Sequence, residues 1–544
     1  MLSWKRRRSI AITAMMNLAL AIGLIAPRLR SDYFPVIDTG FIRVTLREPS
    51  GTRLADTEKT VARFESLVGR DFGVDVQTIV SEIGVSTDDS AGFTPNAGPM
   101  DAVLKIQLKE KRERSTARIV RALRSHVAAD ARFQNVAVSY DSGTTIVPAI
   151  DSAASAAIDV KIQGSSLSQS HRIAESIQNR IAKIAGVVDS RIVQRLDYPA
   201  YFVDVDRAKA ARAGIDPDEI VDNMFVDLDS SRSFNSNLSF YDYSKRRRSP
   251  IGVRIVGEES KGIVSWLNHP IIDRKTRRSI PIRGMAAINR GMMAVELDHS
   301  NLRPTVDLTT GVEGRDLSSV AAEVSRAIGE IGVPDGAGKW IPRDPSARKN
   351  QKMLIAGATI ELKGRSSALD SAKRSLGVAA ILTLICIYMV IAMIYRSYLV
   401  PLAIVAAAAT GSIGATILLY LTDTAIDAQS LFGSIVMFGI TASQALLLID
   451  CAEGSRFRRG LEPFDAIKRA FAERGGTVVV AAFASILSAL PFALAPGRGS
   501  EALTSLGRTI VGFGLTGIVG VMFVAPAVYA LTIRNRAVGS PSSG

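Results

Sequence analysis

Residues 429–450 read QSLFGSIVMFGITASQALLLID, an apolar run with no charged residue before Asp450. A helix needs about 20 predominantly apolar residues to cross the hydrocarbon core of a bilayer. This run therefore predicts a membrane span, and five similar runs predict further spans: residues 10–26, 376–395, 399–420, 478–495 and 509–533. The first of these could instead be a cleavable signal peptide, but no small-residue cleavage site precedes Pro27, which favours a retained span.

Basic residues beside the six runs orient the chain, because cytoplasmic loops carry an excess of Lys and Arg. They precede the first run, occupy the turn after the second, crowd the loop after the fourth and follow the sixth: Lys5, Arg6, Arg7, Arg8, Arg396, Arg456, Arg458, Arg459, Lys468, Arg469, Arg474, Arg534 and Arg536. The opposite loops, residues 422–428 and 496–506, carry Arg498 as their one basic residue. We therefore expect a membrane protein with both termini in the cytoplasm and residues 28–374 on the far side of the membrane.

The composition excludes several functional classes. The 544 residues are 47% hydrophobic and 22% charged, which fits membrane spans joined to a large aqueous domain. Much of the net charge of +14 lies beside the apolar runs, so membrane lipid is the expected partner and nucleic acid is not. There is no phosphate-binding loop, nucleophile motif or metal-ligand cluster, so neither an enzyme nor a bound cofactor or metal is expected.

The long segment between the first two runs, residues 28–374, predicts α+β subdomains. Within residues 41–141 the hydrophobic spacing alternates between period two and period four, which predicts strand, helix, strand, helix, strand. A weak repeat joins residues 157–207 to residues 283–374, and both parts read as a strand followed by a helix. This order favours split βαβ, ferredoxin-like subdomains. Residues 208–282 lack periodicity and are expected to form an insertion.

Ordered motifs along the chain resemble the carboxy-terminal half of the hydrophobe/amphiphile efflux pumps in the resistance-nodulation-division superfamily. They are Tyr33-Phe34-Pro35, Pro49-Ser50-Gly51-Thr52, Val203-Asp204-Val205-Asp206-Arg207, Phe438-Gly439-Ile440-Thr441-Ala442, Leu490-Pro491 and Gly507. The resemblance implies six transmembrane helices in a bacterial inner membrane and a large periplasmic porter domain with a docking insertion. The expected divisions are a first transmembrane helix (1–27), a first porter subdomain (28–156), a second in two parts (157–207 and 283–374), the docking-like insertion (208–282), a five-helix bundle (375–536) and a flexible tail (537–544).

The same resemblance implies proton-driven export of hydrophobic or amphiphilic compounds. Such pumps work as trimers with a periplasmic adaptor and an outer-membrane channel. They take up protons on adjacent aspartates in the amino-terminal half, with a lysine, an arginine and a threonine contributed by the carboxy-terminal half. Here the lysine position holds Ser443, the arginine position holds Arg474 and the threonine position holds Ala481.

The proton-coupling candidates are therefore Arg474, Thr441, Ser443, Gln444 and Asp450. Asp450 is the one carboxylate found in the six runs, and a structural role at a helix end is its alternative. Arg474 is expected to begin its helix at the cytoplasmic face, where an ordinary positive-inside arginine would also stand. Thr441, Ser443 and Gln444 either pack helices together or face a partner's aspartates.

Four functional hypotheses remain open. The first is a half-size pump subunit that needs an amino-terminal partner half bearing the aspartates. The second is an inactive remnant of a truncated pump, and the third is an accessory six-span subunit of protein secretion. The fourth is a metal-ion exporter of the same superfamily, against which the lack of a Met or His cluster counts mildly.

Overall fold

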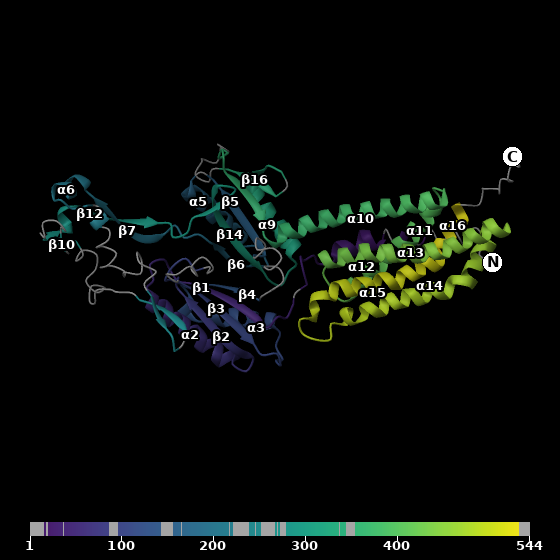
Figure 1. The fold of residues 1–544 in the computed structure, drawn as a ribbon, viewed down its shortest axis with the longest axis horizontal. Coiled ribbons are helices and arrows are strands. Elements are labelled where there is room, and N and C mark those ends of the chain that lie inside the picture. Colours follow the sequence, from purple (N-terminus) through teal and green to yellow (C-terminus); the bar gives the residue numbers. More distant parts are fainter. Residues whose placement is uncertain are drawn as a thin grey trace.

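In the computed structural model two soluble lobes and a distal extension lie at one end of the molecule, and a bundle of long helices lies at the other (Figure 1). The structure describes residues 13, 16, 17, 20–35, 37–85, 96–142, 156–164, 166–216, 218–220, 239–244, 246–251, 267–268, 270–272, 279–336, 338–343 and 354–532.

The first lobe is a four-stranded antiparallel sheet covered by two helices. Its elements are β1 (Phe41–Arg47), α2 (Leu54–Phe72), β2 (Val76–Ile83), β3 (Asp101–Leu108), α3 (Thr116–Ala129), the short η4 (Ala131–Phe133) and β4 (Ala137–Asp141). The strand order is β2-β3-β1-β4. The five expected elements are present, and their alternating residues form the buried core. β2 is additional; its half-exposed face weakens the alternation that would have predicted it.

The second lobe joins two distant parts of the chain in one sheet. It contains β5 (Ile158–Gln163), α5 (Leu167–Ile181), β6 (Val187–Ile192), β13 (Asp298–Ser300), β14 (Arg303–Val312), α9 (Leu317–Ile331), β15 (Gly332–Pro334), β16 (Lys339–Pro342) and β17 (Thr359–Lys363). The order is β13-β14-β5-β17-β16-β15, with β6 also paired to β14. α5 and α9 bury Ile173, Ile177, Val324 and Ile328 against this sheet.

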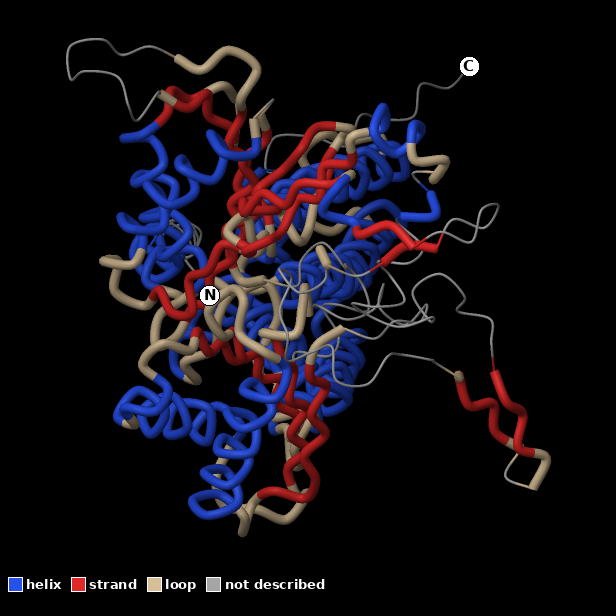
Figure 2. The backbone as a smooth tube through the Cα atoms, turned by 90° about the vertical axis from the view of Figure 1, so that its left-hand side faces the viewer, coloured by secondary structure: helices blue, strands red, loops and turns tan. Residues whose placement is uncertain are grey.

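A two-stranded ribbon of β7 (Tyr198–Val205) and β12 (Ala286–Met293) leads away from the second lobe. At its far end lie α6 (Arg207–Arg212), β10 (Pro270–Ile272), β11 (Ser279–Pro281) and η7 (Ile282–Gly284), with a small buried core. β8 (Ser239–Asp242) and β9 (Arg247–Pro250) form a separate hairpin, on the right in Figure 2. Much of the expected docking insertion, including residues 221–238 and 252–266, lies outside the described residues.

Five helical stretches among the described residues are long and apolar enough to cross a membrane. They are formed by α10 (Arg365–Tyr395), α11 and α12 (Val400–Ala409 and Gly411–Leu421), α13 (Ala428–Arg459), α14 (Pro463–Leu494), and η8 to α16 (Ser500–Leu503, Thr504–Val519, Gly520–Val524, Ala525–Thr532). Of the first predicted span, residues 10–26, the structure describes residues 13, 16, 17 and 20–26. Its described end, η1 (Ala21–Ile25), contacts α12, and η2 (Ala26–Arg28) follows.

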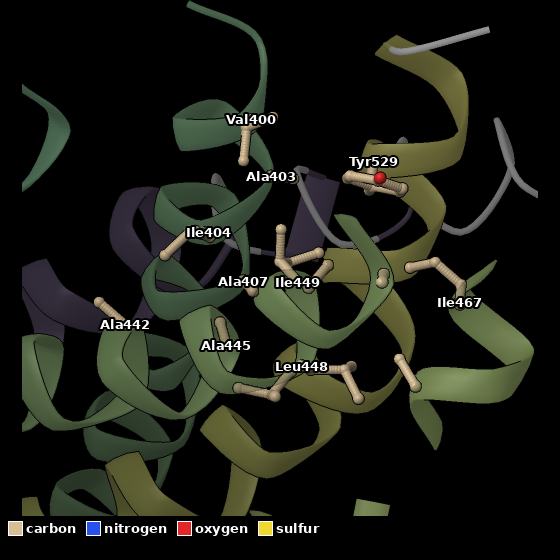
Figure 3. Packing of buried hydrophobic residues seen from close by; sticks show 14 of the residues in the cluster. Val400, Ala403, Ile404, Ala407, Ala442, Ala445, Leu448, Ile449, Ile467 and Tyr529 are labelled. Atoms are coloured by element: carbon tan, nitrogen blue, oxygen red, sulfur yellow. The ribbon is translucent and has the colours of Figure 1, made fainter. Parts of the chain in front are cut away.

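Small residues bring the spans into close contact. Ala403, Ala407 and Ala445 are fully buried where α11 meets α13, and Leu448 and Ile449 fill the space toward α14 and α16 (Figure 3). A Cβ added at Gly512 of α15 would lie 2.5 Å from the carbonyl oxygen of Gly414 in α12. Glycine is therefore required for these two backbones to touch.

Candidate coupling site in the helix bundle

The coupling candidates on α13 lie on two different faces of the helix. Thr441 is 1% exposed and Gln444 is 7% exposed, so both face the interior of this chain's bundle. A Cβ added at Gly517 of α15 would lie 3.1 Å from Oγ1 of Thr441, which places that hydroxyl at a helix contact. Ser443, the residue at the lysine position, is exposed. The packing interpretation therefore fits Thr441, while Ser443 is accessible to another chain.

The expected start of the helix at Arg474 is wrong. α14 begins at Pro463, so Arg474 lies three turns inside it and is exposed. The reason is that residues 463–474, which include several charged side chains, extend the helix ahead of the apolar run 478–495. Pro463 is favourable in the first turn of a helix.

Asp450 lies six residues beyond Gln444, about 9 Å further along the rise of α13. Its carboxylate is exposed and accepts a 2.8 Å hydrogen bond from the hydroxyl of Tyr395 at the end of α10. The contact joins α10 to α13 at the cytoplasmic end that the sequence predicts. The five candidates therefore occupy two levels of the bundle and do not form one compact cluster.

Glu453 is a buried carboxylate that the sequence analysis missed. α13 continues to Arg459, beyond the apolar run, and Glu453 is 6% exposed. Its Oε1 accepts a 2.7 Å hydrogen bond from Tyr529 of α16 and lies 3.4 Å from Nη1 of Arg456. The expectation that Asp450 was the one carboxylate in the spans is therefore corrected. A usable signal was the position of Glu453 four residues after Ile449, on the same buried face.

A second missed carboxylate, Asp427, caps the other end of α13. Asp427 is 1% exposed, and its Oδ1 accepts a 2.8 Å hydrogen bond from the backbone N–H of Ser430. The hydroxyl of Ser430 accepts a 2.9 Å bond from the N–H of Asp427, which completes a capping box. The acidic residue three positions before a serine, at the start of an apolar run, is the sequence signal for this arrangement.

A cavity of about 540 Å³ lies between the two lobes, close to the helix bundle. α3 of the first lobe and the start of α9 in the second lobe line it, together with Arg30, Tyr33 and Arg365. Arg124 crosses from α3 to Asp189 of the second lobe at 2.7 Å and also pairs with Glu313. The lining is thus charged and spans both lobes.

A second cavity, of about 340 Å³, lies among the membrane helices. Its walls are apolar side chains of α10, α13 and α15, among them Leu384, Phe438 and Phe513, and Lys373 of α10 lines it as well. Among the described residues, no group of three or more His, Cys, Asp or Glu side chains could hold a metal ion.

Comparison with known sequences identifies the family. The sequence profile of the AcrB/AcrD/AcrF family matches residues 2–341 and 343–533, which is nearly the whole chain. The chain belongs to the AcrB/AcrD/AcrF family. Members are efflux transporters of the resistance-nodulation-division type, so the expected superfamily is confirmed.

Solved structures support the same fold. Two crystal forms of a heavy metal efflux pump superpose on the chain with TM-scores of 0.76 and 0.75, at 19% sequence identity in both cases. The alignments cover 97% and 98% of this chain and 51% of each pump. The chain therefore spans about half the length of these pumps.

Proposed function

We propose that the chain is one half of a proton-driven efflux pump and works with an amino-terminal half, carried on a partner chain, that bears the proton-binding aspartates. The observation that carries this proposal is the composition of α13. The 22 residues between its capping Asp427 and the exposed Asp450 contain no ionisable side chain. This helix therefore has no group of its own that could take up a proton at mid-membrane.

The position of Ser443 supports the need for a partner. A proton-driven transporter needs a titratable group inside the membrane. Asp427 and Glu453 are each held by partners at the ends of α13, which suits structural roles. Ser443 points out of this chain's bundle at mid-helix, where an acidic partner helix could pack against it.

We assign Arg474 and Asp450 to the cytoplasmic end of the same pathway, and Thr441 and Gln444 to its packed wall. Both lobes are interpreted as variants of the split βαβ, ferredoxin-like subdomain within a periplasmic porter, with the ribbon β7–β12 leading to a docking insertion. The family relationship supports the further proposal that the pump assembles as a trimer with an adaptor and an outer-membrane channel.

The two cavities favour amphiphilic cargo. The membrane cavity offers apolar walls with Lys373 among its lining residues, which suits a hydrophobic tail joined to an anionic or polar head. The cavity between the lobes is charged, which suits passage of the head group. Both lie on the side of the bundle that carries the soluble lobes.

The test is purification of the chain with a carboxy-terminal tag from gently solubilised native membranes, followed by reconstitution with any co-purifying six-span protein. We expect the pair to export an amphiphilic dye from proteoliposomes under an imposed proton gradient, and replacement of the partner's aspartates by asparagine to stop it. Dye export by this chain alone would refute the partner requirement. Export of metal salts but not of dye would refute the amphiphile assignment.

A further inference from the structure

The turn between α14 and α15 has a fixed shape that presents Arg498 to the soluble lobes. α14 ends at Leu494, the residue after it, Ala495, is in the left-handed region with φ of 45°, and Gly499 follows with φ of 83°. Between them the N–H of Gly497 donates a 3.1 Å bond to the Ser500 hydroxyl. Arg498 is also the one basic residue of the two loops that lie opposite the basic cytoplasmic loops.

Arg498 binds the loop between β3 and α3 of the first lobe. Its Nη1 donates a 2.8 Å hydrogen bond to the carbonyl oxygen of Glu110, and its Nη2 donates to the carbonyl oxygen of Arg112. Its Nε lies 3.7 Å from Oδ2 of Asp38. The planar guanidinium presents donors to these acceptors in one rigid fork, whereas an ammonium on its flexible stem holds them less firmly.

The loop that receives Arg498 is itself firmly held. Oδ1 of Asp38 accepts a 3.0 Å hydrogen bond from the N–H of Thr116, the first residue of α3, and also binds the side chains of Arg112 and Thr116. Nη1 of Arg112 donates a 2.8 Å bond back to the carbonyl of Lys109. A displacement of this loop must therefore move the start of α3.

The α14–α15 turn is equally firm on the membrane side. A Cβ added at Gly507 of α15 would lie 2.4 Å from the backbone nitrogen of Ala493 in α14, so the two helices are in backbone contact beside the turn. Nε of Arg508 donates a 3.2 Å hydrogen bond to the carbonyl oxygen of Ala493. The two helix ends and the turn thus form one unit.

We propose that Arg498 is a positioning residue that transmits displacement of α14 and α15 to α3, and thereby sets the width of the cavity between the lobes. The inference deepens the proposed efflux function and rests on it for its purpose. An unbroken series of contacts connects the membrane helices to the cavity. The turn holds Arg498, Arg498 binds the loop 109–115, and this loop leads directly into α3. Four residues of α3 line the cavity: Ala117, Val120, Arg121 and Arg124. A chain of packed side chains, hydrogen bonds and rigid elements of this kind is a route by which displacement passes between distant sites.

The first test measures geometry without transport. Two spin labels report the distance between the lobes by pulsed electron resonance in lipid nanodiscs. They are attached at Arg118→Cys on α3 and Ala322→Cys on α9. The native cysteines are removed by Cys386→Ser and Cys451→Ser. We expect R498A to broaden or shift the distance distribution, and R498K to lie between R498A and the unmodified protein. The matched control is K111A, because exposed Lys111 lies between the two residues whose carbonyls Arg498 binds. A distribution in R498A that equals that of the unmodified protein would overturn the proposal.

The second test measures efflux by the reconstituted pair. We expect R498A to lower the rate at least about tenfold, with partial recovery in R498K and no change in K111A. Full efflux by R498A would overturn the inference while leaving the proposed function intact. If the unmodified pair does not pump, the proposed function fails, and the distance measurement alone then decides whether Arg498 positions α3.

Discussion

At the scale of single residues, the acidic group with the clearest consequence for stability is Asp159 of β5. Asp159 is 7% exposed. Burial raises its pKa to about 6, the nearby charge of Asp307 adds to the shift, and Lys161 at 3.6 Å opposes it. In the unfolded chain this carboxyl titrates at its ordinary pKa near 4. The folded state therefore binds a proton between about pH 4 and pH 6 that the unfolded state has already lost.

We predict that Asp159→Asn stabilises the protein at pH 7.5 by on the order of 1–2 kcal/mol, because asparagine removes the buried negative charge. A raised folded pKa of an acid destabilises the fold above that pKa, and the effect disappears as the pH falls. The gain should therefore shrink between pH 7 and pH 5. Thermal unfolding of the full chain in detergent across this range is the measurement. Exposed Asp335→Asn is the control, and an equal gain at pH 4.5 and pH 7.5 would contradict the linkage.

Residue roles in the bundle were only partly predictable from the sequence. The burial of Thr441 follows from its spacing on α13. The exposure of Arg474 depends on the polar turns that extend α14 ahead of its apolar run. Glu453 and Asp427 escaped notice because a search for charges inside apolar runs excludes helix ends. Whether a carboxylate there is buried depends on a partner distant in the sequence, such as Tyr529.

At the scale of secondary-structure elements, the contact between α12 and α15 depends on the absence of side chains. A Cβ at Gly414 would lie 2.1 Å from the carbonyl oxygen of Gly512 and 2.4 Å from Oγ1 of Thr516. That hydroxyl also accepts a 3.0 Å hydrogen bond from the N–H of Gly414. Any larger residue must separate the helices and break this bond.

We predict that Gly414→Ala destabilises the bundle by about 1–3 kcal/mol, the usual cost of forcing extra atoms into a packed site. Gly439→Ala is the matched control, because Gly439 is also within a span and a Cβ there would meet no atom within 4 Å. Alanine favours helix over glycine, so the control should be neutral or slightly stabilising. Thermal unfolding in one detergent compares the two, and equal melting temperatures would refute the contact.

Elements were the best predicted level of the structure. The period-two and period-four runs of residues 41–141 mark β1, α2, β3, α3 and β4, because each element buries one regular face. β2 was missed because its residues are only partly buried and alternate weakly. The end of α13 and the start of α14 were missed because polar residues form those turns. The pairing of β5 with both β14 and β17 could not be derived from local pattern, since it joins segments more than 140 residues apart.

At the scale of the whole molecule, a buried ionic junction holds the two lobes together. Asp101 of β3 is 1% exposed, and its Oδ1 lies 2.8 Å from Arg195 and 3.4 Å from Arg47. Arg195 comes from the second lobe and also donates to the carbonyl of Glu48 at 2.7 Å. Arg47, from the first lobe, donates a 2.8 Å bond to the carbonyl of Val193 in the second. One carboxylate thus pairs with two arginines, each of which also bonds across to the other lobe.

We predict that Asp101→Asn destabilises the soluble lobes by about 3 kcal/mol or more, because it removes the carboxylate that pairs with two largely buried guanidinium groups. Asp56→Asn is the control: Asp56 pairs with Lys59 at 2.8 Å on the surface, where water screens the ion pair and its loss should change stability little. Thermal unfolding gives the stability, and the spin-label pair across the cavity gives the lobe separation. The junction lies away from the loop that Arg498 binds, so Asp101→Asn should broaden the distances even when Arg498 is intact. A narrow distribution in D101N would mean that the loop and α3 alone fix the lobes, and that the junction contributes only to stability.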